Sequence, residues 1–255
     1  MKNFTLALAV LALLFGVARY SVAEANPDLD RVSMKTATVA DLEKAGDEAR
    51  AQKDFTLAMR YYRSALNKDG KNAPVYNKLG LVQLQLGDLS GARSNFQRAA
   101  RYDSKWGVPL NNLGAVDLQE KKTGSAARYF KKAIALEETN ATFHVNLGSA
   151  WLGQSKVDRA IVEFTRALEL DPEVLNKTSR TGTQVQNSTM EDRAKFQYLM
   201  ARVFASRGDI DQCLQCLKKA KENGYRDLAH VYKDEQFARL WQDQRLAEIV
   251  APPAK

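Results

Sequence analysis

The strongest constraint on the fold of this chain is an internal repeat of 34 residues. Four glycines recur at this spacing, with an alanine twelve residues after each, an aromatic residue four positions later and a second alanine three positions further on. Such periods are typical of stacked supersecondary units, each of which needs its neighbours to bury its apolar face. The glycines are Gly46, Gly80, Gly114 and Gly148, and the first alanines Ala58, Ala92, Ala126 and Ala160; the aromatics are Tyr62, Phe96, Phe130 and Phe164, and the second alanines Ala65, Ala99, Ala133 and Ala167.

These positions resemble the tetratricopeptide repeat, a helix–turn–helix unit marked by Leu-Gly, Ala-x3-aromatic and Pro. Leucine precedes three of the four glycines, and Pro172 closes the fourth unit. The resemblance covers roughly residues 38–223 and implies an all-α fold, an α-solenoid of stacked helix–turn–helix repeats. It also implies a non-enzymatic role in holding other proteins, and it does not identify the partner.

The repeat frame predicts the boundaries of the remaining segments. A degenerate fifth unit is in phase, because Gly208-Asp209 matches the turn at Gly87-Asp88. Apolar residues in the segment that follows predict two short helices that cap the end of the array. The predicted parts are four repeats at 38–172, an insertion loop at 173–192, the fifth repeat at 193–224, capping helices at 225–250 and a disordered tail at 251–255.

The insertion at 173–192 is polar and rich in threonine. Loops of this length inside a compact fold are often functional. A surface insertion without a role is the alternative, and the sequence favours neither.

The N-terminal segment has the three-part layout of a secretory signal peptide. An apolar run from Phe4 to Ala18 is followed by small residues that offer cleavage before Glu24 or Asn26. The run is shorter than the ~20 residues that a membrane span needs, which disfavours the alternative of an uncleaved anchor. We therefore expect a signal peptide at 1–25, a flexible leader at 26–37 and a periplasmic or secreted mature protein.

Charge and chemistry exclude several function classes. The 38 basic and 30 acidic residues are interspersed, which indicates solubility and a mild preference for acidic partners rather than nucleic-acid binding. Only His144 and His230 are present, neither at metal-ligand spacing from cysteine or acidic residues, and His144 occupies an inter-helix packing position. Nucleophile-elbow, phosphate-loop and dinucleotide motifs are absent, so we expect no enzyme, no cofactor and no metal.

Cys213 and Cys216 have the spacing of a redox motif, and export would place them in an oxidising compartment. Redox thiols need a helix N-terminus to lower their pKa, whereas this pair falls inside the second helix of the fifth repeat, with Cys213 at the first alanine position. Packing is therefore the favoured interpretation. A strained disulfide or a thiol redox or metal module is the alternative.

The family resemblance also predicts a ligand face, because first helices of stacked repeats line a concave groove. Asparagine can donate to and accept from a peptide backbone at once, and leucines beside it would take apolar side chains. The asparagines that recur on successive first helices resemble the asparagine rows of family members that bind extended peptide. The predicted groove residues are Lys44, Asn77, Lys78, Leu81, Leu84, Asn111, Asn112, Leu118, Asn146 and Leu152.

Together these features predict an exported scaffold or adaptor that binds a protein or peptide in its groove, in cell-envelope assembly or secretion. The main alternative is a structural subunit of a permanent complex or homo-oligomer. Membrane contact is expected only through partners.

Overall fold

The computed structural model describes residues 34–175 and 190–253. The chain divides into two compact units, Met1–Thr38 and Val39–Lys255. The predicted signal peptide, most of the leader and residues 176–189 of the insertion lie outside the described residues. Among the described helices, none has the length and apolar content needed to cross a membrane.

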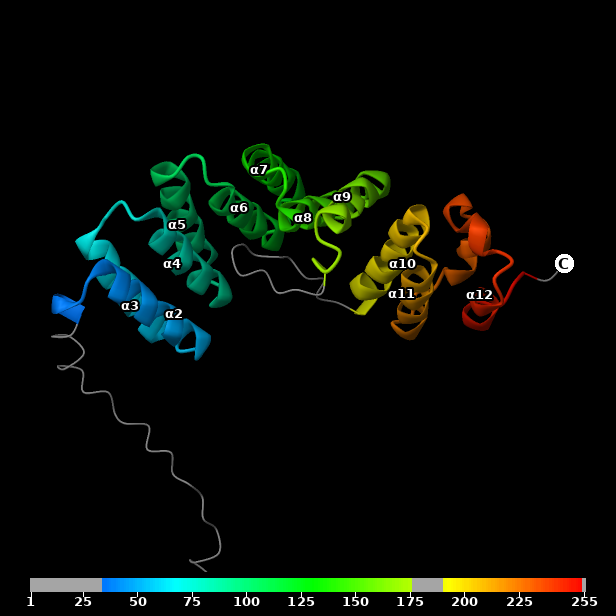
Figure 1. The fold of residues 1–255 in the computed structure, drawn as a ribbon, viewed down its shortest axis with the longest axis horizontal. Coiled ribbons are helices and arrows are strands. Elements are labelled where there is room, and N and C mark those ends of the chain that lie inside the picture. Colours follow the sequence, from blue (N-terminus) through cyan, green and yellow to red (C-terminus); the bar gives the residue numbers. More distant parts are fainter. Residues whose placement is uncertain (1–33, 176–189, 254–255) are drawn as a thin grey trace, which may run out of the picture. The chain divides into compact units, whose positions relative to one another are not determined.

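The second unit is built from α-helices that pack in consecutive pairs, and no strand occurs in the described residues (Figure 1). The second helix of each pair packs on the first helix of the next. The helices are α2 (Val39–Ala51), α3 (Phe55–Lys68), α4 (Ala73–Gln85), α5 (Leu89–Tyr102), α6 (Gly107–Gln119), α7 (Thr123–Leu136), α8 (Ala141–Leu152), α9 (Val157–Leu170), α10 (Met190–Arg207) and α11 (Ile210–Glu222).

The repeated glycines allow the two helices of a pair to approach closely. A methyl group at Gly80 would lie 2.6 Å from the ring of Phe96, and one at Gly114 would lie 2.5 Å from the ring of Phe130. Both distances are far below van der Waals contact, so only glycine fits at these positions while the aromatic ring stays in place. The two phenylalanines are fully buried. The repeat glycine and the aromatic residue of the same helix pair are therefore in direct contact.

Each of the first four pairs turns through a residue in the left-handed region of backbone space. These residues also recur every 34 positions, and only one of them is a glycine. Asp54 and Asp88 follow two of these turns and cap the next helix, where each side chain accepts a backbone N–H. The four turn residues are Lys53, Gly87, Lys121 and Ser155.

The C-terminal elements cover the end of the array. Two 3-10 helices, η1 (Leu228–Tyr232) and η2 (Glu235–Leu240), precede α12 (Gln244–Ile249). Their buried side chains belong to the same apolar core as α10 and α11, which closes the exposed face of the last pair. Two differences from expectation arise here: α10 begins at residue 190 rather than 193, and the cap has three short elements rather than two.

Candidate functional site

Four asparagines on three successive first helices form a hydrogen-bonded ladder. Asn112 on α6 donates from Nδ2 to Oδ1 of Asn77 on α4, at 2.8 Å. Asn146 on α8 donates from Nδ2 to Oδ1 of Asn111 on α6, also at 2.8 Å. A longer contact of 3.4 Å, from Nδ2 of Asn111 to Oδ1 of Asn112, joins the two pairs. The four amides thus form one continuous chain across three repeats.

The ladder amides are buried, which corrects the expectation that they face a ligand and point away from the core. Asn77 is 4% exposed, and Asn111, Asn112 and Asn146 are 0% exposed. Buried amides need hydrogen-bond partners, and the close spacing of first helices lets each amide find one on the neighbouring repeat. The sequence carries one signal for this arrangement, because each inter-helix pair is separated by 35 residues, one repeat plus one position.

The two predicted groove lysines have different surroundings. Lys78 lies 2.6 Å from Oε1 of Glu43 and 2.5 Å from Oδ2 of Asp47, which ties α4 to α2. Burial would lower the pKa of Lys78, but the hydrogen bonds to Asp47 and Glu43 outweigh it and raise the pKa. Lys78 therefore forms structural ion pairs with α2 and is not a free ammonium group that could bind a ligand. Lys44 is well exposed, with only a 3.9 Å contact to Glu48.

Three of the four predicted groove leucines remain half-buried. Leu81, Leu118 and Leu152 each keep part of their surface exposed, whereas Leu84 is 7% exposed and belongs to the core. The inclusion of Leu84 in the ligand face is corrected accordingly. Leu81 stands four residues after Asn77, and Leu118 stands seven after Asn111, so leucine and amide share a helix face.

Comparison with known families decides the identity of these repeats. The family model described as "Tetratricopeptide repeat" matches residues 43–109 and 113–174, about half of the chain. The chain belongs to the tetratricopeptide-repeat family. Proteins of this family are generally non-catalytic scaffolds that bind protein or peptide partners.

Solved tetratricopeptide-repeat structures share the fold at low sequence identity. YrrB, described as having an unusual peptide-binding site, is 18% identical with a TM-score of 0.51, over 80% of this chain and 97% of its own. TTC0263 from Thermus thermophilus is 17% identical with a TM-score of 0.52, over 84% and 99%. MamA is 20% identical with a TM-score of 0.51, over 77% and 95%. Among proteins with curated descriptions, none is significantly similar to this chain in sequence.

His144 joins the two helices of the fourth tetratricopeptide repeat to each other and to the turn that precedes α8. Its Nδ1 lies 2.8 Å from Oε2 of Glu163 on α9, and its Nε2 lies 3.0 Å from the backbone carbonyl oxygen of Glu138. Both ring nitrogens thus face acceptors, and only the protonated imidazole donates to both. Burial lowers the pKa of His144, but the bonds to Glu163 and the Glu138 carbonyl outweigh burial and Arg166, so the pKa is raised.

The raised pKa predicts a pH-dependent stability. Because the folded state holds this proton more tightly than the unfolded state, whose histidine pKa is about 6.5, the contribution is complete below that value. It is lost as pH rises through the folded-state pKa. We expect the free energy of unfolding to fall as pH rises above about 6.5, and His144→Gln to reduce this decrease. Urea titrations across this range measure both; identical pH profiles for the two proteins would contradict the role of His144.

The two cysteines of the fifth repeat are free and buried on α11. Burial raises the pKa of the Cys213 thiol to about 12 and that of Cys216 to about 11. Cys213 lies in the first turn of its helix, nearer the N-terminus than the sequence suggested, yet burial dominates its pKa. Thiols of such high pKa are poor nucleophiles near neutral pH, which favours packing over redox chemistry.

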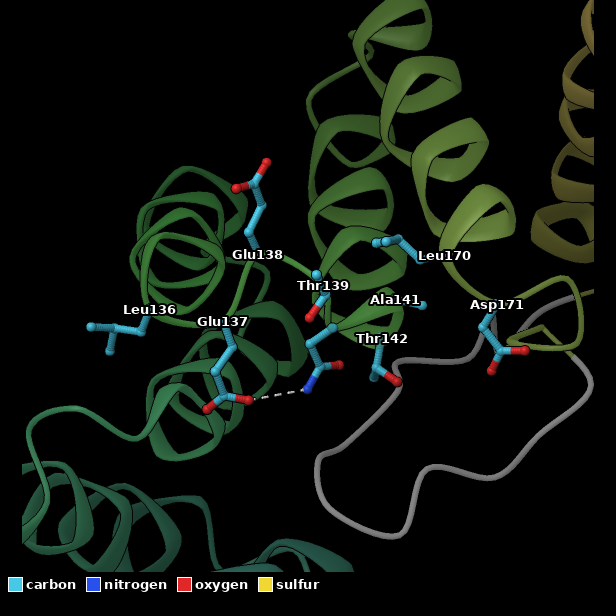
Figure 2. Close-up of a pocket in the computed structure, with 9 residues that line it drawn as sticks. Leu136, Glu137, Glu138, Thr139, Ala141, Thr142, Leu170 and Asp171 are labelled. Atoms are coloured by element: carbon cyan, nitrogen blue, oxygen red, sulfur yellow. Dashed lines mark hydrogen bonds between the residues drawn. The ribbon is translucent and has the colours of Figure 1, made fainter.

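A polar hollow of about 650 Å³ lies beside the turn between α7 and α8 (Figure 2). Glu137, Glu138 and Asp171 contribute carboxylates to its lining. Glu137 already accepts the backbone N–H of Gly107 at 2.6 Å, and its other oxygen accepts from Asn140 at 3.4 Å, drawn as a dashed line in Figure 2. No group of three or more metal-ligating side chains occurs in the described part of the chain.

Proposed function

We propose that this protein is an exported scaffold or adaptor that binds a protein or peptide partner along its first-helix face. The amide ladder is the observation that supports this proposal. It runs across α4, α6 and α8, the direction in which an extended or helical ligand would cross the repeats.

The ladder and the leucines have different tasks in this proposal. Mutual hydrogen bonds fix the orientation of the amides and hold the first helices in register. The half-buried Leu81, Leu118 and Leu152 stand on the same helices and offer apolar surface to a partner. The partner therefore gains most of its contact from the leucines, on a face that the ladder keeps preorganised.

Replacement of the groove leucines tests which face binds. We expect Leu118→Ser with Leu152→Ser to weaken binding of peptides selected from a random library on the immobilised protein by at least tenfold. This is about 1.4 kcal/mol of binding free energy, a small share of what burying two leucines contributes. Titration calorimetry measures the affinities, and circular dichroism confirms that the variants are folded.

A matched control lies on the second helices of the same repeats. Leu136 on α7 is 42% exposed and Leu170 on α9 is half-buried, so Leu136→Ser with Leu170→Ser removes apolar surface from the second helices. The groove proposal fails if this control pair weakens binding more than the groove pair does. A protein that forms only stable oligomers in light scattering would favour the permanent-complex alternative.

Export is the second part of the proposal, supported by the apolar run from Phe4 to Ala18 and the small residues that follow it. We expect the mature chain to begin at Glu24 or Asn26. Intact mass spectrometry of protein purified from its native compartment measures the N-terminus. A mature species that retains Met1 would exclude cleavage.

A further inference from the structure

Three cationic side chains from three different segments converge on the ring of Trp151. The Nζ atoms of Lys131 on α7 and Lys156 in the α8–α9 turn each lie 4.9 Å from the ring centroid, and Cζ of Arg159 on α9 lies 5.1 Å from it. Trp151 itself is 7% exposed, while the three cations are exposed. We call this set of four residues the Trp151 cluster.

Among the described residues, no carboxylate lies within ion-pair distance of Lys131, Lys156 or Arg159. Glu163 on α9 pairs with His144 at 2.8 Å, and the exposed carboxylate of Asp158 lies 3.9 Å from Arg202. The side-chain hydrogen bond of Lys156 goes to a neutral amide, Oε1 of Gln154, at 2.9 Å. The ring face and the C-terminus of α8 offer only partial negative charge to three full positive charges.

Convergence makes these charges act as one site. Because each charge lies about 5 Å from a single centroid, no two of them are separated by more than the ~10 Å Debye length at 0.1 M salt. Their repulsion is therefore only partly screened, and an anion placed among them interacts favourably with all three. A guanidinium beside two ammonium groups is well suited to carboxylates, which Arg binds in a bidentate manner.

The surroundings of the cluster point to a particular kind of anion. Val162 follows Arg159 by one helical turn and is 65% exposed, the highest value among the large apolar side chains that stand out on the surface. Such a side chain gives apolar contact to a peptide and none to a phosphate group. The cluster is also compact, whereas a nucleic acid would need basic residues along a stripe.

We infer that the Trp151 cluster is a second docking site, on the second-helix side of the third and fourth repeats, for a short acidic peptide segment of a partner protein. Two or three carboxylates of the segment bind Lys131, Lys156 and Arg159. An apolar residue beside them packs on Val162. This site uses none of the groove residues, so it goes beyond the proposed function and does not depend on it.

A labelled acidic peptide tests this inference directly. The probe is fluorescein-labelled Asp-Glu-Leu-Glu-Asp, compared with the uncharged Asn-Gln-Leu-Gln-Asn, in polarisation titrations at about 50 mM and about 300 mM NaCl. We expect only the acidic peptide to bind, with an affinity that falls at the higher salt concentration. Lys131→Gln, Lys156→Gln and Arg159→Gln together should weaken binding at least tenfold. Bound peptide should also change the tryptophan fluorescence, and Trp151→Phe should remove that change.

The matched control removes the same charge at three exposed lysines outside the cluster, Lys105, Lys132 and Lys218. This triple replacement by Gln should change the affinity less than twofold. Equal losses in both triple variants would show that net charge alone attracts the peptide and would overturn the site. Absence of acidic-peptide binding at the lower salt concentration would also overturn it. Tighter binding of a DNA duplex or of phosphatidylserine vesicles that depends on the same three cations would replace the peptide with that ligand.

Discussion

Phe130→Ala is expected to lower the free energy of unfolding by about 3–5 kcal/mol, the usual cost of removing a buried phenylalanine side chain. Phe130 is fully buried, and its ring lies against the backbone of Gly114 on the partner helix. Because glycine has no side chain to fill the space, the cavity is closed only if α6 and α7 move together. That movement would disturb the contacts of both neighbouring repeats, since α7 also packs on α8.

Urea denaturation followed by circular dichroism measures this loss, and Leu136→Ala on the same helix is the control. Leu136 is 42% exposed, so its truncation should cost less than about 1 kcal/mol. The m-value is compared as well, because repeat arrays can unfold in parts. If Phe130→Ala unfolds at the wild-type midpoint, the pairing of this aromatic with the repeat glycine is not a main source of stability.

The repeat frame could be predicted from the sequence because it depends on residue size. Only a glycine tolerates a ring at 2.5–2.6 Å from its Cβ position, as at Gly80 and Gly114, so the spacing of small and aromatic residues determines which helices touch. The turns follow the same period, since the residues with left-handed backbone also lie 34 positions apart. The start of α10 was missed although the sequence marks it, because Ser188 and Glu191 have the Ser-x-x-Glu spacing of a capping box.

The side of the helix on which the asparagines act could not be predicted in the same way. An amide is equally suited to a peptide backbone and to another amide, so its residue type does not distinguish a ligand site from a buried ladder. The half-buried leucines illustrate the same difficulty. Leu84 and Leu118 hold equivalent repeat positions, yet Leu84 is core and Leu118 keeps exposed surface, because different neighbours cover them.

The Trp151 cluster was missed for a different reason. Its cations come from α7, a turn and α9, and they are separated by up to 28 positions in the chain. The overall charge pattern looks interspersed because the sequence alternates signs locally. Only the packing of α7, α8 and α9 brings the three cations onto the ring of Trp151.

Asn112→Ala with Asn146→Ala is expected to lower the free energy of unfolding by about 2–6 kcal/mol, since each loss of a buried hydrogen-bond partner costs about 1–3 kcal/mol. The double variant removes all three contacts of the ladder. Oδ1 of Asn77 then loses its donor from α6, and Oδ1 of Asn111 loses its donor from α8. If the amides instead faced solvent, as the sequence first suggested, the same change would cost almost nothing.

The control double is Asn140→Ala with Asn223→Ala, which removes two amides that lie outside the buried ladder and form hydrogen bonds nearer the surface. It should cost less than about 1 kcal/mol. A double-mutant cycle between Asn77 and Asn112 then separates their hydrogen bond from general truncation, with an expected coupling of about 0.5–3 kcal/mol. Zero coupling together with unchanged stability would show that the ladder does not hold the first helices in register. The proposed function would then lose the preorganised face on which it depends.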